Sequence, residues 1–437
     1  MDMPASPTNT IWYSGHVLPE RKEQLADLER LGALLKAANY RLLIQNLCRQ
    51  SLPDSCPATP LPPPDELIES FANANRATQL DYSILQAAAV FSAKSQCDFP
   101  HALAYMKSYC AFLEAQLELE TPCFCIMSVQ FKPWHIVLRS LCEAHGIRFA
   151  YLGGGVLPGT MVLEPGGQMG VSLVAQESEK FKQLPVDKND LEAAVQYLDH
   201  ARRERLSRKP QASERLATLL VTELRKSNEQ IVFCAGQNDI ESGIWPHWLP
   251  EARLHSPFFS NTLEALDYLS LLANKNNWHV LFKPHPMMEQ QHATPIVTCP
   301  ERITCLPGAN IFECMEQSDA TTTILSQAGY LALIHDRPLV MLGRNQLSGK
   351  DCAYEIDSVE ATEAAFKRAF LKDAAATMRE NWLRHVAQVL KYYLIAHDPK
   401  VANISGRGIE TLSKLIIGQV TVASFEEQIE CAWTRQT

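Results

Sequence analysis

The stretch W-H-V-L-F-K-P-H-P at residues 278–286 decides the fold class of this chain. Its apolar half ends at Lys283, and the prolines at 284 and 286 have no backbone N–H to donate. A strand inside a sheet cannot continue through such positions, so the pattern predicts a buried strand that stops at Lys283. The turn after it carries one cation, Lys283, and one imidazole, His285, next to Pro286. We therefore expect a strand end that can bind an anion.

A second stretch, T-T-T-I-L-S-Q-A-G-Y at residues 321–330, repeats this arrangement. Its β-branched run predicts a strand through Leu325, and Ser326 is then expected at the N-cap of a helix over residues 327–335. The free N–H groups of a helix N-terminus bind anions, so Ser326 and Gln327 are candidate ligands of a phosphate. Two strand ends of this kind suit a nucleotide at the edge of a parallel sheet.

The composition restricts the classes of partner. The chain has 437 residues, enough for two or three domains, and a net charge of −9, which does not support a nucleic-acid-binding face. An acidic protein that binds an anion must concentrate positive charge locally, which increases the importance of Lys283 and His285. Its thirteen cysteines show no paired zinc spacing, so we expect reduced thiols and no metal site. No secretory signal and no apolar run long enough for a membrane span are evident.

Strand and helix patterns predict two Rossmann-like units. A strand at 10–13, a helix within 18–38 and a strand at 40–44 open the first unit, and a strand at 231–234 opens the second. We expect a first domain over residues 1–205, a second domain over 206–390 and C-terminal helices over 391–437. The basic run that includes Arg208 and Lys209 suits the linker between them, and contact with anionic lipid is the alternative.

Several polar residues follow predicted strands and are candidate site residues. Gln237, Asp239 and Glu241 come soon after the strand at 231–234, where a parallel sheet presents its ligand crevice. Asp239 and Glu241 could also be solvated acids of a turn. Arg344 follows a strand at 339–343 and could contact a phosphate or a sugar carboxylate.

A glycine-rich stretch at 153–159 allows close approach of a ligand to the backbone. Glu164 is the carboxylate nearest to this stretch and is a further candidate for catalysis. The alternative is that Glu164 is an ordinary turn residue.

The K-P-H-P turn, followed by S-x-x-G-Y-L-A-L-I-x-D-R-P-L-V, resembles the donor half of GT-B Kdo transferases of bacterial capsule and O-antigen biosynthesis. The likeness is nearest to the WbbB-type retaining β-Kdo transferases. It implies two facing Rossmann-like domains, of which residues 1–205 form the acceptor-side domain and residues 206–390 the donor-binding domain, and a last helix that crosses back to the first. It also implies CMP-β-Kdo as donor and a glycan acceptor, lipid-linked in such pathways. By this resemblance Asp239 is the nucleophile, and no metal or other cofactor is needed.

The resemblance is incomplete, and alternatives remain. Where this family has an E-x-G element, the chain has Gly153 or Gly154, so a catalytic acid there is not carried over. An inverting sialyl- or CDP-glycerol-type transferase would use Asp239 or Glu241 as a base. A non-catalytic nucleotide-sugar-binding subunit of an assembly complex would keep the same pocket. In each case we expect a cytoplasmic protein, free or in peripheral contact with the inner membrane.

Overall fold

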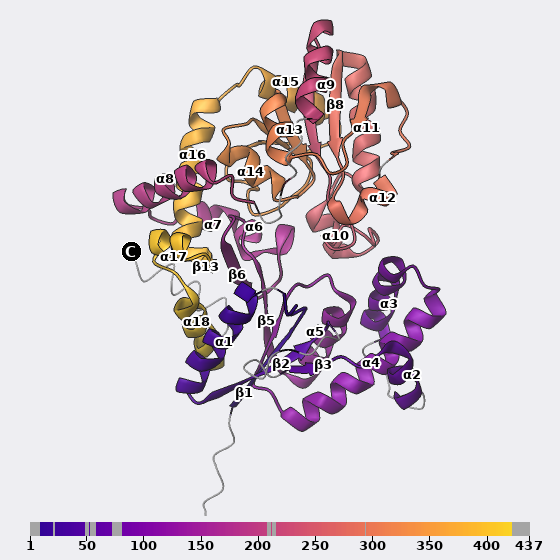
Figure 1. Cartoon of the computed structure of the whole chain (residues 1–437), viewed down its shortest axis with the longest axis vertical. Helices are drawn as coiled ribbons and strands as arrows, with labels where there is room; N and C mark the ends of the chain where they lie inside the picture. Colours follow the sequence, from indigo (N-terminus) through magenta and orange to yellow (C-terminus); the bar gives the residue numbers. More distant parts are fainter. Residues whose placement is uncertain are drawn as a thin grey trace, which may run out of the picture. The chain divides into compact units, whose positions relative to one another are not determined.

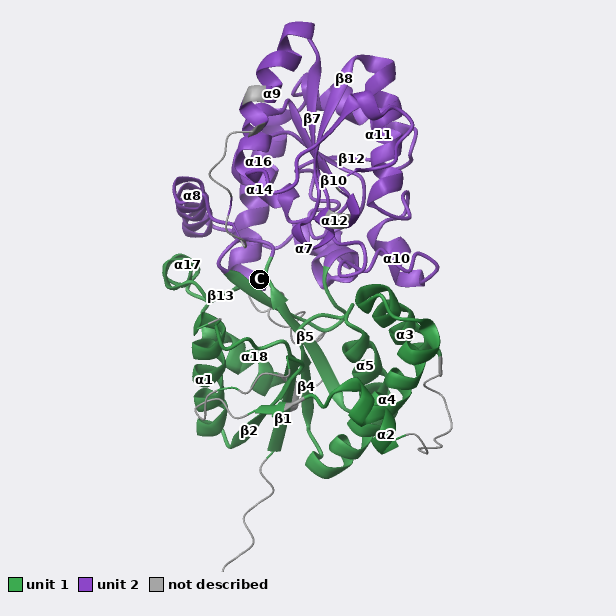
Figure 2. Ribbon diagram, turned by 45° about the vertical axis from the view of Figure 1, so that its right-hand side comes forward, with its two compact units in different colours: residues 1–155, 160–168, 394–437 green, residues 156–159, 169–393 purple. Residues whose placement is uncertain are grey.

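The computed structural model describes residues 9–20, 22–48, 52, 58–71, 81–207, 211, 216–292 and 294–421 (Figure 1). The chain forms two compact units, coloured separately in Figure 2. Unit 1 comprises residues 1–155, 160–168 and 394–437, and unit 2 comprises residues 156–159 and 169–393. The chain therefore passes between the units more than once.

Unit 1 is built on a seven-stranded sheet with the order β13-β6-β5-β4-β1-β2-β3. The strands from β5 to β3 are parallel, whereas β6 and β13 are antiparallel to their neighbours. The strand bounds are β1 Asn9–Gly15, β2 Tyr40–Asn46, β3 Ala58–Pro60, β4 Phe124–Met127, β5 Arg148–Gly154, β6 Thr160–Glu164 and β13 Ile395–Ala396.

Two helices far apart in the sequence share one hydrophobic cluster of this sheet. In α1, Lys22–Ala37, the leucines at 25, 28, 31 and 35 recur at helical spacing and are buried. They belong to one cluster with apolar residues of β1 and β4 and with Ile409, Leu412 and Ile416 of α18, Ile409–Thr421. The other helices are α2 Pro64–Phe71, α3 Asp81–Ser95, α4 Phe99–Glu120, α5 Pro133–His145 and α17 Pro399–Ser405.

Unit 2 contains a six-stranded sheet with the order β12-β11-β10-β7-β8-β9, and every neighbouring pair is parallel. The order reverses between β7 and β10, which is where doubly wound sheets bind ligands. The bounds are β7 Gln230–Ala235, β8 Trp278–Lys283, β9 Ile303–Cys305, β10 Ala320–Thr323, β11 Leu339–Met341 and β12 Tyr354–Glu355.

Helices and short helical turns connect these strands. The apolar side chains of α11, Thr262–Asn276, pack with Trp278, Val280 and Phe282 of β8 in one core cluster. The remaining helices are α6 Leu173–Gln176, α7 Ser178–Lys182, α8 Lys188–Arg203, α9 Leu216–Leu224, α10 Pro250–His255, α12 Glu289–His292, α13 Ile311–Gln317, α14 Ala328–Ile334, α15 Ala361–Phe370 and α16 Ala375–Gln388. Single turns are η1 Met169–Val171, η2 Arg225–Ser227, η3 Pro286–Met288, η4 Pro300–Arg302 and η5 Val389–Tyr393.

The predicted fold class is confirmed, because both sheets are largely or wholly parallel and a helical region follows them. The unit boundary differs from the expected division at 205–206. Residues 169–205 belong to unit 2, since their hydrogen bonds lead there: Tyr197 donates to the Pro158 carbonyl at 3.0 Å, and Gln388 donates to the Leu184 carbonyl at 2.9 Å. Hydrogen bonds between residues so far apart in the chain cannot be predicted from its composition, which is why the expected boundary differs.

At its other end the chain leaves unit 2 after Tyr393 and joins unit 1 through β13, which pairs with β6. Arg208 and Lys209 of the expected linker, and residues 422–437 of the expected C-terminal helices, lie outside the described residues.

Candidate functional site

A cavity of about 490 Å³ lies in unit 2 at the carboxyl ends of β7, β8 and β10. This is the side of the sheet and the reversal of strand order at which a doubly wound fold binds ligands. All its lining residues belong to unit 2. The predicted site residues among them are Gln237, Glu241, Lys283, His285, Pro286, Ser326 and Gln327. The structure therefore brings together side chains from three strand ends that are distant in the sequence.

Lys283 is the last residue of β8, as expected, and its backbone carbonyl accepts from Gly236 N–H at 2.9 Å. That bond holds the β7 and β8 loops side by side. Within the described ranges no carboxylate forms an ion pair with the Lys283 ammonium. Its charge is thus available to an anion in the cavity.

A backbone hydrogen bond orients the His285 ring in the turn after β8. Its Nδ1 accepts from the Met287 backbone N–H at 3.2 Å, across the turn that begins η3. An imidazole nitrogen that accepts carries no proton, so the neutral ring holds its proton on Nε2. Nε2–H can donate to an anionic oxygen in the cavity that His285 lines.

The expected N-cap at Ser326 was wrong by one residue. Strand β10 ends at Thr323 and α14 begins at Ala328, with Gln327 at the N-cap and no side-chain cap bond. The Ser326 N–H donates to Thr323 Oγ1 at 3.1 Å, and the Ser326 hydroxyl accepts from Ala328 N–H at 3.3 Å. The serine therefore closes a local turn before the helix. Its hydroxyl proton can still be donated to a ligand.

Gln237 connects two strand ends. Its side-chain oxygen accepts from the Leu325 N–H at 3.1 Å, and its amide group donates to Asp239 Oδ1 at 3.4 Å. The side chain is 4% exposed, so these bonds form away from bulk water. We interpret Gln237 as a residue that links the loops after β7 and β10 beside the cavity.

Asp239 does not line the cavity. Its carboxylate is 7% exposed and accepts from Thr262 N–H at 3.0 Å and from Thr262 Oγ1 at 2.6 Å, at the first residue of α11. Burial raises the pKa of this carboxyl group, and the bonds from Thr262 and Gln237 oppose the shift. The arrangement is that of a carboxylate that stabilises a helix N-terminus.

Glu241 lines the cavity, together with Asn238 and Ser242. Its backbone N–H donates to the Asn238 side-chain oxygen at 3.1 Å, so Glu241 lies in an Asx-type turn after β7. The side chain is intermediate in exposure. Of the two predicted acids after β7, Glu241 is therefore the one at the cavity.

Two further predicted residues lie elsewhere. Glu164 is fully buried within β6, opposite Tyr151 of β5, so it occupies neither the expected turn nor the unit 2 cavity. The three apolar residues before it, Met161 to Leu163, also pair with β5. Arg344 is exposed and does not line the cavity. Burial raises the pKa of Glu355, and the charge of Arg344 is among those opposing this shift.

Two glycines of the glycine-rich stretch, Gly153 and Gly155, serve packing within unit 1. A Cβ on Gly153 would collide with the Gln168 side chain, and one on Gly155 would collide with Thr160. The absence of a Cβ at Gly153 therefore leaves room for the Gln168 side chain against β5. At Gly153 and Gly155 it is side chains of the protein that approach the backbone closely, whereas Val156 and Pro158 of the same stretch line the cavity of unit 2.

Sequence reasoning missed several residues of the cavity wall. Val156, Pro158 and Met169 come from before the expected donor domain, and Glu289 accepts from Gly308 N–H at 2.9 Å across the rim. No signal in the sequence joins Met169 to a site more than sixty residues later, whereas Val156 and Pro158 lie in the glycine-rich stretch that was expected to approach a ligand. Asn238 and Ser242 could have been predicted from the sequence, because they belong to the same polar run as Gln237 after the strand at 231–234.

In the part of the chain that the structure describes, no group of three or more His, Cys, Asp or Glu side chains is arranged to hold a metal ion. None of the described helices combines the length and apolar character required to cross a membrane.

Residues 215–379, which contain β7 to β12 and most of the cavity wall, match the model of the family described as capsule polysaccharide biosynthesis protein. The match covers less than half of the 437-residue chain. Unit 2 is thus similar to this family over its sheet. No curated protein sequence matches the chain.

Solved structures with related topology have very different sequences. KpsC of Thermosulfurimonas dismutans, a beta Kdo 2,7 transferase, is 12% identical with a TM-score of 0.44, over 89% of this chain and 92% of that one. The beta Kdo 2,4 transferase of the same KpsC is 13% identical with a TM-score of 0.40, over 62% and 84%. The UDP-GlcNAc 2-epimerase of Methanocaldococcus jannaschii is 10% identical with a TM-score of 0.35, over 83% and 92%. At these values, the likenesses establish no activity for this chain.

Proposed function

We propose that this protein is a glycosyltransferase that moves Kdo from CMP-β-Kdo to a bacterial surface glycan. The observation that carries the proposal is the convergence of Lys283, His285 and Ser326 on one cavity at the point where the strand order reverses. A cation, an imidazole N–H and a hydroxyl together suit the single phosphate of a CMP-sugar. The match of residues 215–379 to a capsule biosynthesis family supports the same assignment.

The catalytic carboxylate of the proposal is Glu241 rather than Asp239. Asp239 is occupied by Thr262 and lies outside the cavity wall, whereas Glu241 lines the cavity. The resemblance to retaining β-Kdo transferases requires a carboxylate nucleophile at this strand end. Glu241 meets that requirement because it lines the cavity. Asp239 has a supporting role, because its carboxylate accepts hydrogen bonds from Thr262 of α11 and from Gln237.

Transfer with retention then takes two displacements. A Glu241 oxygen attacks the anomeric carbon of Kdo, the bond to the phosphate oxygen breaks, and the electron pair leaves with CMP. Lys283, His285 and Ser326 stabilise the charge that develops on the departing phosphate. An acceptor hydroxyl oxygen next attacks the same carbon, the bond to Glu241 breaks, and the hydroxyl proton passes to solvent. Each displacement inverts the centre, so the β configuration returns.

The proposal includes no metal or other cofactor, and its acceptor is a glycan, lipid-linked during assembly at the cytoplasmic face of the inner membrane. A thermal-shift series with CMP, CDP, UDP and GDP tests the donor class first. CMP should give the largest shift. A preference for UDP or GDP would contradict the CMP-sugar assignment.

Turnover is tested by CMP release from CMP-Kdo in the presence of surface-glycan acceptors, with NMR of the product anomer. Retention and an intact-mass adduct of one Kdo on the peptide containing Glu241 are expected. An inverted product without an adduct would assign Glu241 as a base of an inverting transferase. CMP binding without turnover on any acceptor would favour a non-catalytic nucleotide-sugar-binding subunit.

A further inference from the structure

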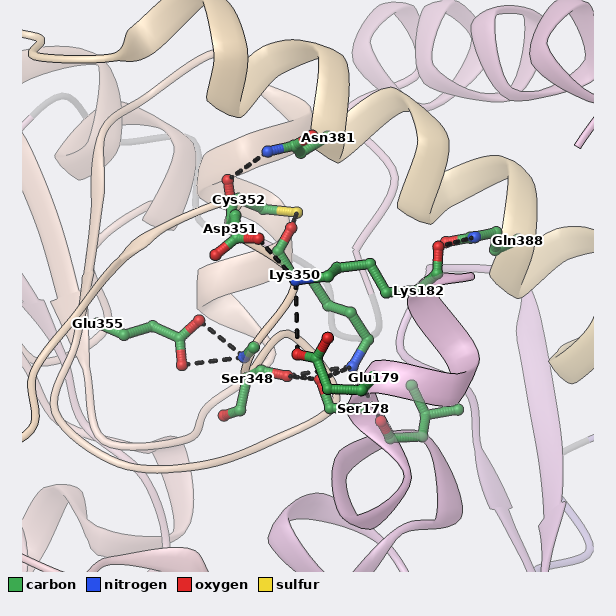
Figure 3. Close-up of polar contacts among 12 residues, drawn as sticks. Ser178, Glu179, Lys182, Ser348, Lys350, Asp351, Cys352, Glu355, Asn381 and Gln388 are labelled. Carbon is green, nitrogen blue, oxygen red and sulfur yellow. Dashed lines mark hydrogen bonds and ion pairs between the residues drawn. The ribbon is translucent and has the colours of Figure 1, made fainter. Parts of the chain in front are cut away.

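Lys350 is a buried lysine in the loop between β11 and β12, and only 2% of the residue is exposed. Its ammonium group donates to the Val174 carbonyl at 2.9 Å, to Ser178 Oγ at 2.8 Å and to the Ser348 carbonyl at 3.1 Å. Figure 3 shows this lysine beside Ser178 and Ser348. Three protons thus meet three oxygen acceptors, two of which belong to α6 and α7.

All three acceptors of Lys350 are uncharged, which is unusual for a buried cation. The nearby carboxylates have other partners. Asp351 pairs with Lys182 at 2.8 Å, and Glu355 accepts from Gly349 N–H at 2.9 Å (Figure 3). The position of the Lys350 ammonium is therefore set by hydrogen bonds to uncharged oxygens of α6, α7 and its own loop, and not by a counter-ion.

That segment, residues 169–182, leads directly to the cavity. Val174 lies within α6, whose N-cap Ser172 donates through its hydroxyl to the Met169 carbonyl at 2.7 Å. Met169 lines the cavity. Gly170, next to it, donates to His255 Nδ1 at 3.1 Å. Segment 169–182 is thus held at one end by His255 and at the other by Lys350.

We propose that Lys350 is a positioning residue for the donor cavity, which holds segment 169–182 so that Met169 forms part of the cavity wall. This role rests on the proposed donor site, but the placement of the segment can be measured without any ligand. Removing the ammonium removes its bonds to Val174 and Ser178 and leaves the strands of unit 2 intact, while Ser178 Oγ still donates to the Ser348 carbonyl at 2.9 Å. The wall at Met169 then moves, and a ligand of the cavity binds less tightly.

The charged and titratable groups around Lys350 come from α7, the β11–β12 loop, β12 and α16. The α7 helix contributes Glu179 and Lys182, the loop and β12 contribute Asp351, Cys352 and Glu355, and α16 contributes His385. None of them accepts a hydrogen bond from the Lys350 ammonium, whose three bonds go to Val174, Ser178 and Ser348. A substitution at 350 therefore removes the hydrogen bonds from Lys350 to segment 169–182 without breaking an ion pair.

The experiment compares Lys350→Met with Lys182→Met, which removes a partly exposed lysine of the same segment. Hydrogen exchange is followed in peptides from 169–182 and in peptides from β8 and α11. Lys350→Met should raise exchange by about tenfold or more in 169–182 alone, and Lys182→Met should change it much less. The affinity for CMP should fall by about tenfold in Lys350→Met, with a similar melting temperature.

Unchanged exchange in 169–182, or an equal rise throughout unit 2, would overturn the inference. A lower melting temperature with unaltered CMP affinity would show a purely structural lysine and would also overturn it. If Lys350→Met does not fold, Ser178→Ala removes one acceptor of the ammonium together with the hydroxyl bond to the Ser348 carbonyl, and exchange should still rise at the same peptides. If wild type does not bind CMP, the proposed function fails, whereas the exchange comparison still decides the placement of the segment.

Discussion

The substitution Asp239→Asn tests whether the Asp239 carboxylate stabilises unit 2 or takes part in the reaction. In the structure the two Asp239 oxygens accept from Thr262 N–H and from Thr262 Oγ1, with Gln237 as a third, longer donor. Asparagine keeps the shape but replaces one oxygen with an NH₂ group that cannot accept. One hydrogen bond to a charged group is lost, which costs about 1.5–3 kcal/mol.

The consequence should be visible in thermal unfolding. For a unit of this size, about 2 kcal/mol corresponds to a fall in melting temperature of about 4–8 °C. Transfer by the folded protein should remain within about tenfold of wild type, because the Asp239 side chain does not line the cavity.

Glu241→Gln is the matched comparison, since it makes the same chemical change two residues later at the cavity wall. Its melting temperature should lie closer to wild type than that of Asp239→Asn, and CMP should still bind. Transfer should fall by about a thousandfold or more, because the amide cannot form the glycosyl ester. The assays are differential scanning fluorimetry and CMP release from CMP-Kdo. The reasoning is refuted if Asp239→Asn abolishes transfer at an unchanged melting temperature while Glu241→Gln stays active.

Three further predictions concern the phosphate ligands and Lys350. His285→Ala should weaken CMP binding by about 1.5–3 kcal/mol by titration calorimetry, whereas His247→Ala, which is outside the cavity wall, should not; equal effects would remove His285 from the site. Ser326→Ala should lower CMP affinity less than His285→Ala and cost about 0.5–1 kcal/mol of stability, because its bond from Ala328 is long; a loss of stability alone would make Ser326 structural. Burial lowers the pKa of Lys350 to about 8, so from about pH 8 to about pH 10 the unfolded chain holds a proton there that the folded chain has lost. Raising the pH through this window should therefore increase the free energy of unfolding of wild type relative to Lys350→Met, measured with denaturant, and an unchanged difference would contradict the shift.

The sequence by itself determined the sheet class of unit 2 and the end of its strand β8, whereas β10 ends two residues earlier than expected. Val280 to Phe282 could only be a buried strand, and the prolines at 284 and 286 fixed where it stops. The same local logic located Gln237, Lys283, His285 and Ser326, because polar residues directly after a parallel strand must lie at its carboxyl edge. These inferences depend on neighbours in the sequence, which is why they could be made without the structure.

The tertiary structure alone decided which acid faces the cavity. Asp239 and Glu241 are two residues apart, and their roles depend on Thr262, which the fold of α11 brings against Asp239. It also decided that Glu164 is buried in β6 and that Met169 belongs to the wall of a site in unit 2. Hydrogen bonds between residues far apart in the chain, such as that from Lys350 to Val174, leave no local pattern of spacing or polarity. They exist only once the chain has folded, because packing selects which of many polar groups become neighbours.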